Sequence, residues 1–161
     1  MKTTLEEAKE RNHDEIVSDL QELLEKNYDA EKGFKKAIED AKNPNLKAYL
    51  KNQAFTRNRF ATEIDKILHD LNEHPKESGS TAGTLHRTWI DIKTAVTGHS
   101  DESILEECIR GDKASVEEYE EKLKDNRFTS EIASVLQKQL ADIRQTLSTT
   151  KSLENLTEQV K

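Results

Sequence analysis

The chain has 161 residues, of which 33% are hydrophobic and 35% are charged, and it carries a net charge of −7. With five glycines and two prolines it has few helix breakers, so its composition favours one domain of long amphipathic helices and excludes a sheet protein. The negative charge argues against a surface that binds nucleic-acid phosphates, and no stretch approaches the roughly 20 apolar residues of a membrane span.

The first two predicted helices form an antiparallel pair. From about residue 10 to residue 42, apolar side chains recur every three or four positions, which predicts one long amphipathic helix. Asn43 and Pro44 end it, because asparagine can cap the next helix and proline suits a first helical turn. The second helix continues to a stop before His74 and Pro75. So short a connection forces the two helices to run antiparallel.

Three further helices are predicted in the second half of the chain. Residues 76–83, KESGSTAG, are the only Gly/Ser-rich stretch and predict a loop, which leads into a short helix over residues 84–96. A long helix is predicted from about residue 101 to residue 124, and another follows the capping residue Thr129. The tail to residue 161 keeps apolar residues in helical phase but is otherwise polar, and we expect it to fray.

Four long helices and one short helix predict an all-α, four-helix bundle. A helix of about 30 residues is about 45 Å long, a distance that the stretch from Pro75 to Ser100 could span. The predicted architecture is therefore two antiparallel helix hairpins, with the short extra helix inside a long crossover between them. Residues 1–161 are interpreted as a single domain with a core from about residue 10 to about residue 150.

Three stretches carry a family resemblance: NYDAEKGFKKA (27–37), TRNRFATEI (56–64) and, most specifically, ESGSTAGTLHRTWIDIKTAVTGHSDESILEECIRGD (77–112). They resemble a family of uncharacterised, mostly bacterial ferritin-like four-helix-bundle proteins, catalogued as a domain of unknown function. The resemblance extends from about His13 to about Ser148 and implies a ferritin-like fold with no agreed activity.

The sequence departs from that family's pattern at two places. The family often has an acidic residue directly after the cysteine, whereas here Cys108 is followed by Ile109. The family's frequent histidine late in the last helix is missing near Leu147. Both changes remove side chains that could bind a metal ion.

Polar side chains recur on the apolar faces of the predicted helices. When the two hairpins are laid against each other, these side chains fall at one level near the middle of the bundle. The predicted inner polar layer consists of Asn27, Glu31, Gln53, Arg57, Asp112 and Gln139. Arginine is always charged and cannot coordinate a cation, so we expect Arg57 to form a buried pair with Glu31. This interpretation makes the layer structural, with no catalytic residue and no bound metal.

A metal site is the alternative interpretation of the same layer. Ferritin-like di-iron bundles need a Glu from two helices and a Glu-x-x-His pair from each of the other two. The only such pair in this chain is Glu10 and His13, at the start of the first helix. Iron or manganese would instead require inward carboxylates, with Arg57 turned outward. The candidate ligands are Glu31, Glu107, Asp112 and Asp142.

The leading functional hypothesis is a non-catalytic bundle that acts through protein contacts, as a homodimer or with another protein, and needs no cofactor. The lone cysteine, Cys108, excludes an internal disulfide, and the charged start lacks the apolar core of a signal peptide. We therefore expect a cytoplasmic protein that contacts neither nucleic acid nor membrane. A role in the stress response follows only by analogy with ferritin-like bundles. The alternatives are a metal-binding oxidase or metal-storage-like bundle and, third, a bundle that opens onto lipid or onto partner helices.

Overall fold

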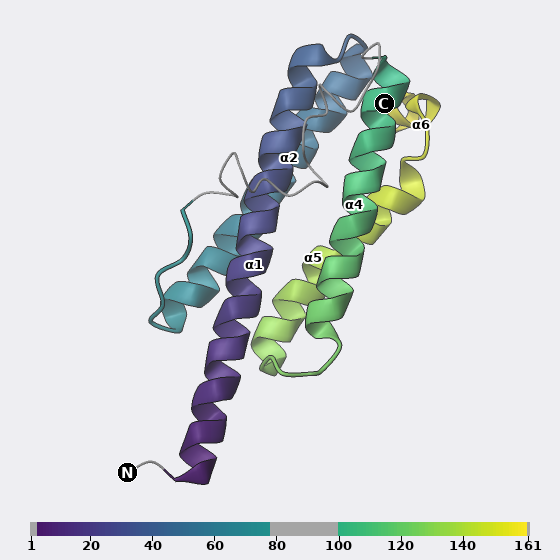
Figure 1. Ribbon diagram of the computed structural model, residues 1–161. Coiled ribbons are helices and arrows are strands. Elements are labelled where there is room, and N and C mark those ends of the chain that lie inside the picture. Colours follow the sequence, from purple (N-terminus) through teal and green to yellow (C-terminus); the bar gives the residue numbers. More distant parts are fainter. Residues whose placement is uncertain (1–2, 78–99, 161) are drawn as a thin grey trace.

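The computed structural model describes residues 3–77 and 100–160, with side chains to Leu156. Every regular element in these ranges is a helix, which confirms the predicted all-α class. The helices are α1 (Thr4–Asp40), α2 (Pro44–Asp70), α4 (Asp101–Leu123), α5 (Ser130–Thr149) and α6 (Leu153–Val160). In Figure 1, α1 and α2 form one antiparallel hairpin and α4 and α5 form the other. The short helix predicted over residues 84–96 lies outside the described residues.

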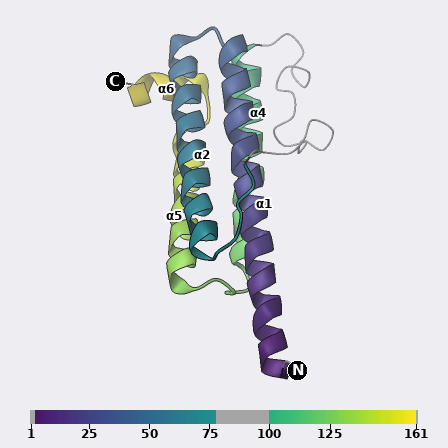
Figure 2. The same ribbon diagram turned by 90° about the vertical axis from the view of Figure 1, so that its left-hand side faces the viewer.

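Helix α1 begins at Thr4, earlier than the sequence pattern predicted. The Thr3 hydroxyl accepts a hydrogen bond from the Glu6 amide, and the Glu6 carboxylate accepts one from the Thr3 amide. This reciprocal capping box supplies partners for backbone amides that a helix start leaves unpaired. The first turns are exposed, and Figure 2 shows that they extend past the ends of the other helices.

The start of α4 is fastened to the turn between α1 and α2. The Asp101 carboxylate accepts hydrogen bonds from the backbone amides of Lys42 and Asn43, each at 2.9 Å. The Asn43 side chain in turn accepts from the Asn45 amide at 2.8 Å and caps α2, as predicted. Helices α2 and α4 therefore begin at the same end of the bundle and run parallel, which agrees with a long crossover between the hairpins.

The sequence pattern predicts that the tail after α5 frays, but part of this tail forms a helix that packs on the core. Thr150 is extended and ends α5, and α6 then folds back as a separate short helix. Leu156 of α6 is only 1% exposed and packs with apolar side chains of α2 and α4, among them Leu46 and Leu105. The gain from burying this leucine at one end of the core outweighs the polar character of the tail.

The core consists of two apolar clusters that lie one above the other along the bundle. One contains Leu20, Leu24, Phe60, Ile64, Leu136 and Ile143 among others. The other contains Phe34, Leu46, Leu50, Ile104, Cys108 and Leu156 among others. Between them, each of the four long helices contributes buried polar side chains, and this layer is the candidate site in the interior.

Candidate functional site

Arg57, in the middle of α2, is the centre of the buried polar layer. Its side chain is only 2% exposed. One terminal nitrogen of Arg57 donates to the side-chain oxygen of Asn27, Oδ1, at 2.9 Å. The other donates to Asp112 Oδ1 at 2.8 Å and to Ser115 Oγ at 3.0 Å. A single guanidinium from α2 thus joins α1 to α4, and its charge is compensated by one carboxylate.

A hydrogen-bonded chain runs from Asn27 to the surface between α2 and α5. The Asn27 amide nitrogen donates to Leu23 O and to the Tyr119 hydroxyl, at 2.9 and 2.8 Å. Tyr119 donates to Gln139 Oε1 at 2.6 Å, and the Gln139 amide nitrogen donates to Phe60 O and to Glu63. Both N–H bonds of each side-chain amide are used, so the chain fixes the orientation of both groups.

Burial keeps the ionisable groups of the layer protonated or tightly paired. It raises the pKa of Asp112 above the usual value, and the Arg57 charge offsets part of that rise. Burial also raises the pKa of Tyr119 to about 12 and raises the pKa of the Cys108 thiol well above its usual value. Since the thiolate is the reactive form of cysteine, Cys108 is an inert core residue at neutral pH.

The structure brings four of the six predicted layer residues together and leaves two apart. Asn27, Arg57, Asp112 and Gln139 are all buried within the network. Glu31 and Gln53 are only half-buried.

The expected pair between Glu31 and Arg57 is wrong, because Arg57 pairs with Asp112. Glu31 lies one turn beyond Asn27 on α1, at the edge of the contact with α2. There its carboxylate accepts from Asn58 at 3.2 Å and pairs with Lys35 at 2.8 Å. The Glu31 side chain is 13% exposed, so water and Lys35 stabilise its negative charge. A dry, unpaired position in the interior would not stabilise that charge.

Ser115 and Tyr119 belong to the layer but were missing from the predicted set. Residues 112, 115 and 119 follow helical spacing on one face of α4. Extending the polar face from Asp112 by this spacing would have found both residues.

The alternative metal ligands do not converge in the structure. The Glu107 carboxylate forms an ion pair with Arg110 on the same helix, at 2.5 Å. Asp142 is half exposed and forms an ion pair with Arg59 at 3.2 Å. Asp112 faces Arg57, which points inward instead of outward. Across residues 3–77 and 100–160, no three His, Cys, Asp or Glu side chains form a group that could hold a metal ion.

Comparisons with known proteins identify a family and a fold. A family model described as a domain of unknown function, DUF2383, matches residues 15–125. A search of curated proteins found no match. One similar solved structure is described as a ferritin-like, diiron-carboxylate protein from Bacillus anthracis strain Ames. It shares 14% identity, with a TM-score of 0.68 over 93% of this chain and 98% of that one. This likeness confirms the ferritin-like fold predicted above.

The residues described here do not fit a diiron-carboxylate group. Such a group needs several carboxylates from facing helices around two closely spaced cations. The carboxylate that meets Arg57 in the buried layer is Asp112, and it already compensates a permanent guanidinium charge. Separately, no helix in the described ranges is both long and apolar enough to cross a membrane.

Proposed function

This chain belongs to the DUF2383 family, and on that footing we propose that it is a non-catalytic helical protein that acts through contacts with other proteins. The proposal needs no cofactor. With it goes the expectation of a cytoplasmic protein that serves in the stress response, which rests on the general associations of ferritin-like bundles alone.

The buried Arg57 guanidinium is the observation that carries the proposal. A carboxylate-lined bundle needs a positive charge at its centre, and in metal-binding bundles the ions supply it. In this chain Arg57 supplies a fixed positive charge beside Asp112, 2.8 Å away. A divalent ion placed next to a guanidinium that cannot lose its proton would be repelled in a medium of low dielectric constant. The interior chemistry therefore favours holding the helices together over binding ions.

The titratable groups near Arg57 support the same proposal. The hydroxyls of Tyr49 and Tyr119 and the thiol of Cys108 all have raised pKa values, with burial as the main cause. At neutral pH each of these groups keeps its proton and is a poor nucleophile or base.

Metal analysis tests the proposal directly. The protein would be expressed without an affinity tag in iron- and manganese-supplemented culture, and its metal content measured by elemental mass spectrometry. We expect no stoichiometric iron or manganese, and no change in thermal midpoint when Fe²⁺, Mn²⁺ or a chelator is added. A metal present at about 100 times its dissociation constant would stabilise the fold by about 2.7 kcal/mol, which moves the thermal midpoint by about 5–11 °C.

The metal-binding alternative makes the opposite prediction in the same experiment. The fold shared with a protein described as diiron-carboxylate favours it as the second candidate. Near-stoichiometric metal, with Fe²⁺ oxidation above the buffer blank, would overturn the non-catalytic proposal. An Asp112→Asn variant that lost the metal would then assign the site to the buried layer.

A further inference from the structure

One face of α2 combines an exposed aromatic side chain with unpaired lysines. Residues 44–62 contain no Asp or Glu, although the whole chain has a net charge of −7. Phe55 is 70% exposed in the middle of this stretch. Lys47 and Lys51 are exposed on the two preceding turns and have no ion pair within the described part of the chain. We call Lys47, Lys51 and Phe55 the Phe55 face.

The Phe55 face borders a shallow groove between α2 and α1. Ile38 and Phe55 contribute apolar surface to it, and Lys51, Lys35 and Glu31, which pairs with Lys35, also line it. A large aromatic side chain exposed in mid-helix beside apolar surface is typical of an interaction site. The surrounding cations favour an acidic partner surface.

A groove between α4 and α5 has the complementary character. It is lined by glutamates and leucines, together with two cations and an amide: Glu117, Glu120, Glu121, Leu123, Leu140, Lys124, Arg144 and Gln137. Glu120 lies 3.5 Å from Arg144, whereas Glu117 and Glu121 are exposed and have no ion pair among the residues described. We call this surface the glutamate groove. The three glutamates carry a charge of −3, and Lys124 and Arg144 together carry +2, so the residues that line the groove have a net charge of −1.

The two surfaces lie on opposite sides of the bundle. The Phe55 face belongs to the α1–α2 hairpin and the glutamate groove to the α4–α5 hairpin, and Figure 1 shows these hairpins side by side. One copy of the chain cannot bring its own Phe55 into its own groove. A second copy can present the matching surface.

We infer that the protein associates with itself head to tail, with Phe55 of one copy in the glutamate groove of the next. Phe55 covers Leu123 and Leu140, and the two lysines meet Glu117 and Glu121. Packing like on like would set lysine against lysine or glutamate against glutamate, which disfavours a two-fold symmetric contact at either surface. A contact between two different surfaces continues into a ring or an open chain. The inference rests on the proposed function, since it names the protein that this bundle contacts.

Sedimentation velocity of the intact protein tests the association. From about 10 µM to about 500 µM, we expect the weight-average sedimentation coefficient to rise beyond that of a dimer. Raising the salt from about 50 mM to about 500 mM should weaken the association several-fold, because exposed charge pairs are screened. A wild-type protein that stays monomeric at the highest concentration would overturn the inference.

Two variants identify the surfaces. Phe55→Ser removes the aromatic anchor, and we expect it to weaken association roughly tenfold or more. Glu117→Lys/Glu121→Lys reverses the groove charges without touching the Glu120–Arg144 pair, and should have a similar effect. Leu5→Ser, at the other large hydrophobic residue exposed within the described ranges, and Glu102→Lys/Glu106→Lys, a matched pair on α4, are controls that should change nothing.

Mixing the two variants gives the decisive result. Each variant keeps one working surface, so an equimolar mixture should form a dimer and stop there. If Phe55→Ser abolishes association but the groove variant does not, a symmetric Phe55 contact replaces the inferred one. All variants should melt like the wild type, because every substituted residue is exposed. Metal content is independent of these results, so failure of the self-association and failure of the metal-free proposal are distinguishable.

Discussion

Arg57 combines a permanent charge with almost complete burial, and its contacts explain how the interior tolerates it. Asn27, Asp112 and Ser115 all accept hydrogen bonds from its terminal nitrogens at 3.0 Å or less. Charge-assisted hydrogen bonds of this kind are stronger than neutral ones. The desolvation cost of both ions remains, however. Removing one partner therefore lowers the stability of the fold more than replacing both, because it leaves one buried charge without a counter-charge.

Arg57→Met should lower the free energy of unfolding by about 3–5 kcal/mol, because it leaves Asp112 buried without a counter-charge. The double variant Arg57→Met/Asp112→Leu should recover part of that loss. Urea denaturation of the four proteins in this cycle gives the coupling energy. Arg59→Met, which breaks a half-exposed pair with Asp142, should cost about 1 kcal/mol or less. Equal losses at both arginines would contradict the buried pairing.

Tyr119 should make the fold sensitive to alkaline pH. Burial raises its pKa from 10.0 to about 12, so the folded chain holds this proton more tightly than the unfolded chain does. The resulting stabilisation is complete below about pH 10 and is lost as pH rises toward about 12, at up to about 1.4 kcal/mol per pH unit. Urea denaturation from about pH 8 to about pH 11.5 should show a shallower decline for Tyr119→Phe than for wild type. Parallel curves would show that Tyr119 contributes no such linkage.

The elements could be predicted from the sequence where local signals mark them. Pro44 and Thr129 fixed the starts of α2 and α5, since capping and proline geometry depend on adjacent residues. The start of α1 was predicted too late because apolar spacing begins only at Ile16, although Thr3 and Glu6 already carry the capping signal.

Long-range packing decided what the sequence could not. Whether Glu31 or Asp112 meets Arg57 depends on the register of α1 against α2 and on how one hairpin is staggered against the other. Residue spacing within one helix contains no such information. The same holds for α6, where Leu156 is buried by side chains of α2 and α4 far away in the chain. The polar layer could therefore be predicted as a layer, but its internal pairing could not.

Helix α6 should contribute measurably to stability through one residue. Leu156→Ala should lower the free energy of unfolding by about 2–5 kcal/mol, the usual range for a buried leucine. The loss is limited if this short helix detaches before the bundle unfolds, and amide hydrogen exchange would show that as selective loss of protection in α6. Glu154→Ala, exposed on the same helix, should change stability by less than about 0.5 kcal/mol. Similar effects from the two substitutions would mean that α6 does not pack as described.

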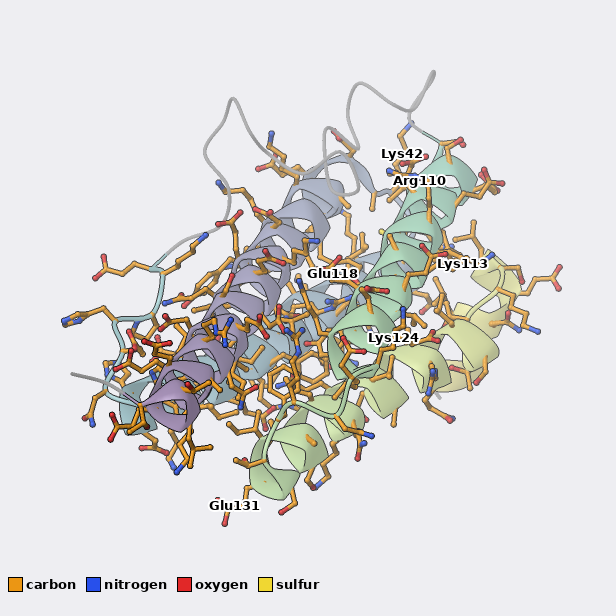
Figure 3. All side chains as sticks on the ribbon, turned by 60° about the horizontal axis from the view of Figure 1, so that its bottom comes forward. Lys42, Arg110, Lys113, Glu118, Lys124 and Glu131 are labelled. Carbon is orange, nitrogen blue, oxygen red and sulfur yellow. The ribbon has the colours of Figure 1, made fainter. Side chains whose placement is uncertain are left out.

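The two hairpins are joined across the whole molecule by ionic contacts between α1 and the α4–α5 region. Asp19 of α1 lies 2.7 Å from Arg127 and 3.4 Å from Lys122, and Lys26 lies 2.6 Å from Glu118. Figure 3 shows Glu118 between the ribbons of α1 and α4. Burial would lower the pKa of Lys122, but the nearby carboxylates, first Glu22 and then Asp19 and Glu118, raise this pKa on balance. Asp19 therefore links two cations of the second hairpin to the first.

Asp19→Asn should destabilise the protein in a salt-dependent way. Loss of charge-assisted hydrogen bonds at a residue only 8% exposed should cost about 1.5–3 kcal/mol at low salt. The difference from wild type should shrink when salt rises from about 50 mM to about 500 mM. Comparing each variant with wild type at the same salt removes the general effect of the net charge. Asp142→Asn, at a half-exposed pair, is the control, and a salt-independent loss at Asp19 would argue for packing over charge.

The single polar layer between two apolar clusters also determines how the hairpins are aligned along their long axes. Leucines and alanines one turn apart are nearly interchangeable, so a uniformly apolar bundle could slide by one turn, about 5.4 Å, at little cost. Sliding one hairpin by one turn against the other would separate Arg57 from Asp112 and Ser115, and Asn27 from Tyr119. Polar groups in a core select one alignment in this way in coiled coils. Only 33% of the residues in this chain are hydrophobic. The polar layer makes one axial alignment of the hairpins lower in free energy than the alignments shifted by one turn.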